Sequence, residues 1–258
     1  MSGIYIHIPF CKKACHYCNF HFSTNQNSKS SFIKAVSNEL QLRSSEYESK
    51  KVKTIYFGGG TPTVLQISEL TSILDVVYEF YNVSETPEIT LEANPDDLDL
   101  EKIVTLSKTK INRLSIGVQS FHETDLVVMN RAHSADEAKI CLEIATKYFD
   151  NISIDLMFGM PTMSADLWRE NLQTAFGFGI KHLSCYSMTV EPQTALEHFI
   201  KKGSHPPMDD ELAANHFKVL IEEALKDGFI IFEYNLYFYQ NNLNSKIESV
   251  IYKKNQIE

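Results

Sequence analysis

Short apolar stretches alternate with amphipathic stretches along most of this chain, and this alternation constrains the fold more than any other feature. Stretches that predict β-strands occupy residues 4–8, 54–57, 88–92, 113–118, 152–157 and 182–188. A stretch with apolar positions at helical spacing follows each of them, at residues 31–48, 68–80, 100–108, 134–149, 167–178 and 209–226. We expect Ser31 to cap the first of these helices and Gly228 to end the last. Strand–helix units with short connections favour an α/β fold, in which helices cover a parallel sheet.

Length and composition are those of one large globular domain. The chain has 258 residues, of which 43% are apolar and 22% are charged, so it can bury a sizeable core. A net charge of −9 argues against a general nucleic-acid-binding protein, which usually carries a basic patch. The residues before the first strand are too few for a signal peptide, and no apolar run reaches the length of a transmembrane helix. We therefore expect no nucleic-acid partner, no transmembrane segment and a cytoplasmic location.

Three of the five cysteines follow the first predicted strand directly. Pro9 ends this strand, and Cys11, Cys15 and Cys18 stand on the next loop in Cys-x3-Cys-x2-Cys spacing. Three thiolates within eight residues can converge on one metal centre, because a loop of that length folds back on itself. The other two cysteines lie apart, in a predicted helix and a predicted strand, and we expect them to be buried thiols in a reducing compartment: Cys141 and Cys185.

Three thiolates leave a four-coordinate metal centre one ligand short, and this permits three interpretations. A [4Fe–4S] cluster held by three cysteines keeps one iron open for another ligand. A catalytic zinc ion also keeps an open position, and His16 or His21 is then a candidate fourth ligand. Purely structural cysteines are the third interpretation. The spacing favours the cluster, because zinc sites commonly combine a Cys-x2-Cys pair with a distant second pair.

A glycine-rich turn follows the second predicted strand, with the sequence Gly58-Gly59-Gly60-Thr61. Glycines let a backbone approach a ligand closely and offer N–H groups to a carboxylate or a phosphate. The turn does not match the Gly-x4-Gly-Lys-Ser/Thr pattern, so we do not expect a P-loop.

Polar side chains lie at or near the ends of the later strands. Glu92 ends the third strand and Gln119 ends the fourth. Arg131 follows the fourth strand, and Asp155 lies within the fifth. Because the carboxyl ends of parallel strands meet at one edge of a sheet, these residues predict a site for a polar, charged ligand. By charge, Arg131 suits a carboxylate, Glu92 an ammonium group, and Asp155 or Gln119 a hydroxyl group.

The cysteine motif resembles the signature of the radical S-adenosylmethionine (SAM) superfamily, in which an aromatic residue such as Tyr17 precedes the last cysteine. Three features narrow the resemblance: YIHIPFC at the end of the first strand, Phe20 after the cysteines, and GGGTPT after the second strand. They are similar to the oxygen-independent coproporphyrinogen III oxidase-like family, and in particular to its heme-chaperone branch. The resemblance runs from about Ile4 to about Phe232. It implies a partial (βα)6 TIM-like barrel of the radical SAM type.

The resemblance also implies cofactors. Cys11, Cys15 and Cys18 would hold a [4Fe–4S] cluster whose open iron chelates SAM, and an electron donor would drive the cleavage of SAM to a 5′-deoxyadenosyl radical. In this family the GGGTP motif holds the methionyl end of SAM. The positions that match SAM-contacting residues are Tyr5, Gly59, Gly60, Thr61, Glu92, Gln119, Arg131 and Asp155. The number of SAM molecules, one or two, stays open. His7 shares the alternation of Tyr5, and either faces the same ligand or is a satisfied core histidine.

Two classes of function follow from the resemblance. Phe20 stands where the oxidase branch carries a fourth nearby cysteine, and this difference favours a chaperone that binds heme and delivers it to an apo-protein. The alternative is an oxidase that decarboxylates the propionate groups of a porphyrinogen. A zinc-binding module is a third, weaker interpretation.

The resemblance ends near residue 232. We expect a radical SAM core at residues 1–232 and a divergent tail at 233–258, because the tail shows no clear helix or strand period. The family continues into an HNxxYW stretch and a separate carboxyl-terminal domain, whereas this chain departs from the pattern after Glu233. A truncated or aberrant reading of a longer gene is the simplest explanation. We then expect an exposed, apolar open side of the barrel, and we expect any heme handling that needs the missing domain to be weak or absent.

Overall fold

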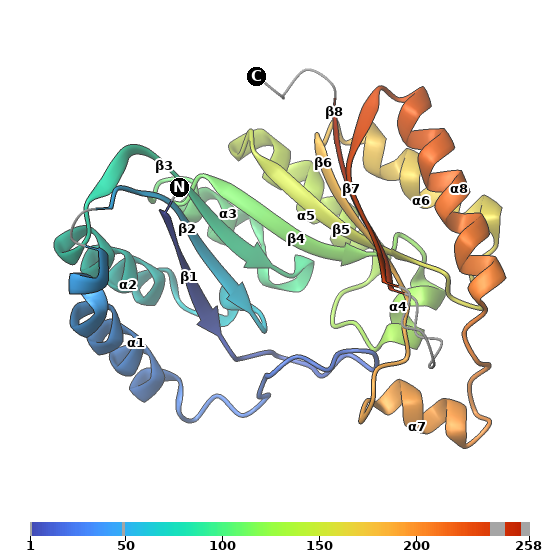
Figure 1. Cartoon of the computed structure of the whole chain (residues 1–258), viewed down its shortest axis with the longest axis horizontal. Coiled ribbons are helices and arrows are strands. Elements are labelled where there is room, and N and C mark those ends of the chain that lie inside the picture. Colours follow the sequence, from blue (N-terminus) through green and yellow to red (C-terminus); the bar gives the residue numbers. More distant parts are fainter. Residues whose placement is uncertain (1, 48–49, 238–245, 254–258) are drawn as a thin grey trace.

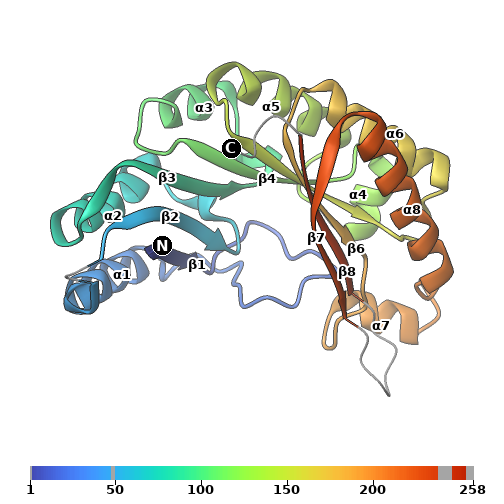
Figure 2. The same ribbon diagram turned by 45° about the horizontal axis from the view of Figure 1, so that its top comes forward.

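The six predicted strands form one parallel sheet. In the computed structural model, which describes residues 2–47, 50–237 and 246–253, each strand pairs in parallel with the next one along the chain (Figure 1). The strands are β1 (Ser2–Ile8), β2 (Val52–Gly59), β3 (Val83–Ala93), β4 (Arg113–Gln119), β5 (Ile152–Phe158) and β6 (His182–Ser187). The sheet curves into an open, partial barrel (Figure 2). The predicted α/β fold is therefore confirmed.

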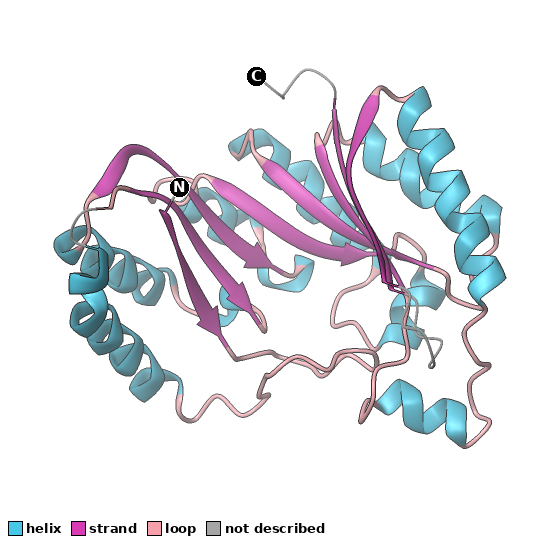
Figure 3. Cartoon of the chain, viewed as in Figure 1, coloured by secondary structure: helices cyan, strands magenta, loops and turns pink. Residues whose placement is uncertain are grey.

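Helices alternate with the strands, and most of them cover the outer face of the curved sheet (Figures 2 and 3). They are α1 (Lys29–Arg43), α2 (Ile67–Phe80), α3 (Leu100–Leu106), α4 (Glu123–Met129), α5 (Ala135–Tyr148), α6 (Ala165–Gly177), α7 (Ala195–Lys201) and α8 (Asp210–Lys226). The sequence prediction lacks α4 and α7, whose short sequences show no clear apolar period. Within the described ranges, none of the helices combines the length and the apolar character needed to cross a membrane.

The ends of two helices test the capping predictions. Gly228 follows α8 with a φ of 79°, in the left-handed region that glycine adopts at helix ends, as predicted. α1 begins at Lys29, directly after Ser28, and the hydroxyl group of Ser31 donates to the carbonyl oxygen of Ser28 at 2.8 Å. The prediction that Ser31 caps this helix is therefore wrong.

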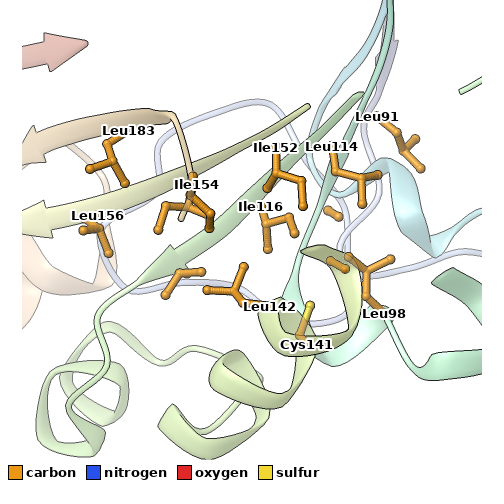
Figure 4. Close-up of a cluster of buried hydrophobic side chains, with 14 of the residues drawn as sticks. Leu91, Leu98, Leu114, Ile116, Cys141, Leu142, Ile152, Ile154, Leu156 and Leu183 are labelled. Atoms are coloured by element: carbon orange, nitrogen blue, oxygen red, sulfur yellow. The ribbon is translucent and has the colours of Figure 1, made fainter. Parts of the chain in front are cut away.

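The hydrophobic core lies between the sheet and its outer helices. Ile116 of β4 and Ile154 of β5 are completely buried and face Leu142 of α5 (Figure 4). Cys141 belongs to the same layer and is 2% exposed, while Cys185 on β6 is fully buried. Both were expected as buried thiols, and this expectation is confirmed.

The inner face of the sheet is polar. Arg113 of β4 is buried there and donates hydrogen bonds to the hydroxyl groups of Thr90 on β3 (3.2 Å) and Ser153 on β5 (2.8 Å). Ser153 in turn donates to the hydroxyl group of Ser115 at 3.0 Å. Apolar residues thus point out toward the helices and polar residues point into the barrel, where they form the floor of the site described below.

The sheet continues beyond the six parallel strands. β7 (Phe229–Tyr237) and β8 (Lys246–Lys253) pair antiparallel with each other, and β8 pairs antiparallel with β6. Periodicity predicts neither strand, so the expectation of no regular structure after residue 233 is wrong for these residues. β7 crosses the expected boundary between residues 232 and 233, and the division into a core and a tail stays a prediction. Residues 238–245 and 254–258 of the expected tail lie outside the described residues.

Candidate cluster and cofactor site

The carboxyl ends of the strands surround a cavity of about 370 Å³, which the loop after β1 borders. Almost all residues that the sequence analysis selects line this cavity: Cys11, Cys15, Cys18, Gly59, Gly60, Thr61, Glu92, Gln119, Arg131 and Asp155. The exception is Tyr5, whose side chain is 58% exposed on β1 and does not reach the wall of the cavity. The barrel therefore brings together side chains that are up to 144 positions apart in the sequence, from Cys11 to Asp155.

The cysteine loop (residues 9–23) crosses from the end of β1 toward α4 and α7 (Figure 1). Its two ends pair with each other, since the N–H of Cys11 donates to the carbonyl oxygen of Ser23 at 3.0 Å. Lys12 then forms salt bridges with Asp96 (3.2 Å) and Asp97 (2.5 Å) on the loop after β3. The side chain of Asp97 is nearly buried, so this pair is better shielded from water than most surface salt bridges.

The middle of the cysteine loop is held by the end of α4. The amide of Asn130 donates to the carbonyl oxygen of Ala14 at 2.7 Å. His16 donates from its backbone N–H to the carbonyl oxygen of Met129 (3.1 Å) and from Nδ1 to that of Val128 (2.9 Å). The Nδ1 contact positions the loop and leaves Nε2 as the nitrogen that could bind a metal ion. His16 lines a different pocket from the three cysteines, however, and this counts against it as a zinc ligand.

The far end of the loop is held from β6. The amide of Asn19 donates to the Glu191 carboxylate at 2.8 Å, and Thr189 donates to the same carboxylate at 3.0 Å. Asn19, Thr189 and Glu191 all line the cavity. These contacts, together with those to Lys12 and His16, connect the loop to three different strands of the barrel.

The glycine turn lets the backbone after β2 lie against the start of the cysteine loop, and the N–H groups of Gly60 and Thr61 are already used in this contact. The N–H of Gly60 donates to the carbonyl oxygen of Ile8 (2.8 Å), and the N–H of Thr61 donates to that of Phe10 (2.7 Å). A Cβ atom at Gly60 would lie 2.7 Å from the Phe10 carbonyl oxygen and 2.9 Å from the sulfur of Cys11, so only glycine allows this contact. The expectation that these N–H groups are available for an anion is therefore wrong for Gly60 and Thr61.

Two hydrogen bonds hold the carboxylate of Glu92 in place. The hydroxyl group of Tyr56 donates to Glu92 Oε1 at 2.7 Å, and the N–H of Gly59 donates to Oε2 at 3.0 Å. Burial raises the pKa of Glu92, whereas these two hydrogen bonds lower it. Tyr5 stacks on Tyr56 with 5.8 Å between the ring centroids, so it reaches Glu92 only through Tyr56.

Tyr56 is missing from the sequence prediction, although a signal exists. It lies on β2 two residues before Gly58, on the face of the strand that points into the barrel. His7 lies on the same face of β1 and is satisfied, because Nδ1 is 3.2 Å from the hydroxyl group of Tyr5 and Nε2 is 3.3 Å from the carbonyl oxygen of His21. His7 is therefore satisfied but only half-buried on the inner face of the barrel, and the choice between the two interpretations stays open.

Asp155 lies deeper in the cavity, beside the hydroxyl group of Ser184. Burial and the negative charge of Glu92 raise the pKa of Asp155 to about 7, against the opposing effects of Ser184, Arg131 and Arg113. The site therefore contains two neighbouring carboxyl groups that resist simultaneous ionisation unless a cation joins them.

Arg131 connects the cysteine loop to the sheet. Its Nη2 donates to the amide oxygen of Asn94 (2.6 Å) and to the carbonyl oxygen of Gly117 (2.7 Å). Its Nη1 is 3.4 Å from the sulfur of Cys15 and 3.3 Å from the hydroxyl group of Tyr17. The Nε atom is buried and has no partner among the described residues. The positive charge of Arg131 on the cavity wall is suited to an anionic group that enters the cavity, although Nε itself is shielded from that space.

Gln119 has an unusual backbone. Its φ is 70°, which is uncommon for a residue other than glycine, and the β4–β5 register shifts between Gly117 and Gln119. The bulge turns the end of β4 and places Gln119 on the cavity wall. Strain of this kind persists where the surrounding structure holds it, often at a functional site.

Comparison with known proteins agrees with this geometry. The Radical SAM superfamily matches residues 5–190, which is most of the chain. The chain belongs to the radical SAM superfamily. The match includes all three cysteines of the loop and every cavity residue named above except Glu191.

The similar curated proteins of this superfamily are longer than the chain. The heme chaperone HemW of Bacillus subtilis is 34% identical over 90% of this chain and 62% of its own length. HemW of Escherichia coli K12 is 32% identical over 94% of this chain and 65% of its own length. The chain thus spans less than two thirds of either chaperone. The solved structure of E. coli coproporphyrinogen III oxidase (HemN) is 22% identical, with a TM-score of 0.82 over 98% of this chain and 56% of that chain, and this shows the shared fold.

Radical SAM proteins use a [4Fe–4S] cluster and SAM, and the donor chemistry of the loop fits such a cluster. Cys11, Cys15 and Cys18 are free thiols on one cavity wall. In the described part of the chain, no three His, Cys, Asp or Glu side chains gather tightly enough for a single metal ion. A cubane does not require so tight a group, because each thiolate binds a different iron. The residues present therefore suit a cluster better than the zinc ion of the alternative interpretation.

Proposed function

We propose that Cys11, Cys15 and Cys18 hold a [4Fe–4S] cluster and that SAM binds in the adjoining cavity. The observation that supports this most is that all three thiols and all but one of the residues matching SAM contacts line the same cavity. When bound, the cluster would supply the single electron for reductive cleavage of SAM. The residues of the chain would bind and orient SAM and keep water away from it.

Charge assigns the roles of the SAM-binding residues. Arg131 would attract the carboxylate by its positive charge at the cavity wall, and Glu92 would accept from the ammonium group. Asp155 and Gln119 would accept from the ribose hydroxyl groups, and the turn at Gly59, Gly60 and Thr61 would shape the wall beside the methionyl end. Tyr5 would act through Tyr56, since its own ring lies outside the wall.

We further propose that the chain binds heme as part of heme delivery to an apo-protein. The curated relatives at 34% and 32% identity bear the name heme chaperone. Phe20 supports this proposal over the oxidase alternative, because it occupies the place of the fourth nearby cysteine of the oxidase branch. Its ring is 69% exposed at the rim of the cavity, where a flat aromatic ligand can stack. The five free thiols suit a reducing compartment such as the cytoplasm.

Anaerobic reconstitution with iron and sulfide tests the cluster. We expect EPR of the reduced protein to show a [4Fe–4S] signal that changes when SAM is added. Alanine in place of Cys11, Cys15 or Cys18 should abolish the signal, because two thiolates do not hold a cubane in this loop. Cys141→Ala and Cys185→Ala are the matched controls and should keep it, since both thiols are buried away from the cavity. Full iron content in a loop variant would refute the assignment.

Calorimetry of the reconstituted protein tests the SAM site. Glu92→Ala and Arg131→Ala should each weaken SAM binding by roughly 1.5–3 kcal/mol, which is the range for hydrogen bonds to charged groups. Gln119→Ala should weaken SAM binding by less than either charge variant, because the amide of Gln119 is neutral. Unchanged affinity in both charge variants would show that SAM binds elsewhere.

A heme titration beside a porphyrinogen decarboxylation assay separates the two heme-related functions. We expect saturable heme binding that Phe20→Ala weakens and no decarboxylated product. Leu100→Ala is a suitable control, because Leu100 is also exposed (54%) but lies outside the cavity wall. Decarboxylation of the porphyrinogen without heme binding would establish the oxidase alternative.

A further inference from the structure

Each sulfur of the cysteine motif has its own hydrogen-bond donor. The hydroxyl group of Thr61 donates to Cys11 with 3.5 Å between oxygen and sulfur. Nη1 of Arg131 donates to Cys15 at 3.4 Å. The sulfur of Cys18 accepts from the backbone N–H of Phe20. Two of the three donors are side chains from outside the cysteine loop, so the barrel itself determines the surroundings of these sulfurs.

A single residue orients both side-chain donors. The amide nitrogen of Asn94 donates to the hydroxyl oxygen of Thr61 at 3.1 Å, and its amide oxygen accepts from Nη2 of Arg131 at 2.6 Å. Because the Thr61 oxygen accepts from Asn94, its own proton is directed at the sulfur of Cys11. Because Nη2 of Arg131 is held by Asn94, the planar guanidinium turns Nη1 toward Cys15.

The two ends of the Asn94 amide cannot be exchanged in this network. Arg131 has only donors and therefore requires the oxygen of Asn94, which leaves the nitrogen for Thr61. Asn94 lies on the cavity wall directly after β3, and Pro95 begins the short 3₁₀ helix that follows it. The sequence Ala93-Asn94-Pro95 thus places one amide between two donors and two cysteines.

We propose that Asn94 is a positioning residue that sets the electrostatic surroundings of the cluster, by directing Thr61 to Cys11 and Arg131 to Cys15. This inference rests on the proposed cluster. Hydrogen bonds and positive charge at the cluster sulfurs stabilise the reduced form, which carries more negative charge, and so raise the midpoint potential. Loss of Asn94 releases both donors and makes the cluster harder to reduce.

The test is an EPR-monitored redox titration of the reconstituted full chain without SAM, which leaves SAM binding out of the measurement. Asn94→Ala and Thr61→Val should each shift the midpoint potential to a more negative value than that of the wild type. Asn94→Asp still accepts from Arg131 but draws the Thr61 proton away from Cys11, so it should also shift the potential downward. Thr61→Ser keeps the hydroxyl group and should have the same midpoint potential as the wild type.

Thr162→Val is the matched control. It removes a partly buried hydroxyl group that donates to Asp125 and not to a sulfur, at a position outside the cavity wall and the cysteine loop. We expect no change of potential in this variant. The double variant Asn94→Ala/Thr61→Val should shift the potential by less than the sum of the two single shifts, because Asn94 acts partly through Thr61.

The outcomes distinguish this inference from the proposed function. Suppose that the wild type assembles the cluster and that Asn94→Ala and Thr61→Val, at full iron content, have the same midpoint potential as the wild type. This result would overturn the inference and leave the proposed function standing. A wild-type protein that assembles no cluster would overturn the proposed function and the inference with it. If Asn94→Ala assembles poorly, the comparison of Thr61→Val with Thr61→Ser decides, and equal potentials for these two variants would overturn the inference.

Discussion

The buried carboxyl group of Asp155 makes the stability of this protein depend on pH in a direction that can be measured. Its pKa is raised to about 7 in the folded chain by burial and by the charge of Glu92. In the unfolded chain an aspartate titrates near 3.9. Between these two values the folded protein holds a proton that the unfolded chain has lost, so the free energy of unfolding falls as pH rises from about 4 to about 7. Asp155→Asn removes this dependence.

The size of the effect follows from the separation of the two pKa values. One pKa unit corresponds to about 1.4 kcal/mol, so the full difference between wild type and Asp155→Asn is up to about 4 kcal/mol. Part of this stability difference is already present at pH 5. Between pH 5 and pH 8 we expect the stability advantage of Asp155→Asn over wild type to grow by about 2.5 kcal/mol.

Urea unfolding of the apo-protein at a series of pH values measures this difference. Trp168 is a suitable fluorescence probe, because it is the only tryptophan, is fully buried and donates to the carbonyl oxygen of His216. Asp75→Asn, on the exposed face of α2, is the control and should follow the wild type at every pH. A difference between Asp155→Asn and wild type that is the same at pH 5 and pH 8 would refute the reasoning, because the carboxyl group would then not titrate in this range.

Three further predictions concern single side chains. Tyr56→Phe should weaken SAM binding in calorimetry by about 1–2 kcal/mol without loss of the cluster, since Glu92 loses one of its two hydrogen bonds. An unchanged affinity would show that the Tyr56 hydroxyl group is not needed to hold Glu92. Gln119→Gly should raise the free energy of unfolding by about 1 kcal/mol, seen as a higher urea midpoint, because glycine tolerates the φ of 70°. A lower midpoint would show that the turn is not strained. Trp168→Ala should lower the free energy of unfolding by about 3–5 kcal/mol, since the ring packs on Phe158 in the core. Urea unfolding monitored by circular dichroism measures this loss, and a loss below about 1 kcal/mol would contradict that packing.

The sequence alone was sufficient to predict the parallel sheet and the wall of the cavity. Apolar runs such as Ile152–Phe158 are short and bounded, and each is followed by a helical pattern, so the order of strands follows from local signals. Glu92 and Gln119 could be placed at the site because the carboxyl ends of parallel strands meet on one side of the barrel. The cysteines are close in sequence, so their common position at one cavity is also a local property.

The sequence did not predict the strands β7 and β8. Both pair antiparallel at the edge of the sheet next to β6. Pairing at a sheet edge is a long-range interaction, and the local pattern of residues 229–253 carries little information about it.

What the sequence by itself determined was therefore the order of strands and helices, the loop with its three cysteines and the polar residues at the strand ends, since each depends on neighbours a few positions away. Only the tertiary structure decided how these residues contact one another. Asn94 touches Thr61 and Arg131, Tyr56 reaches Glu92, and Glu191 holds Asn19, across 33 to 172 positions of the chain. Hydrogen bonds of this kind depend on strand register and on the curvature of the sheet, which emerge only when the whole barrel has packed.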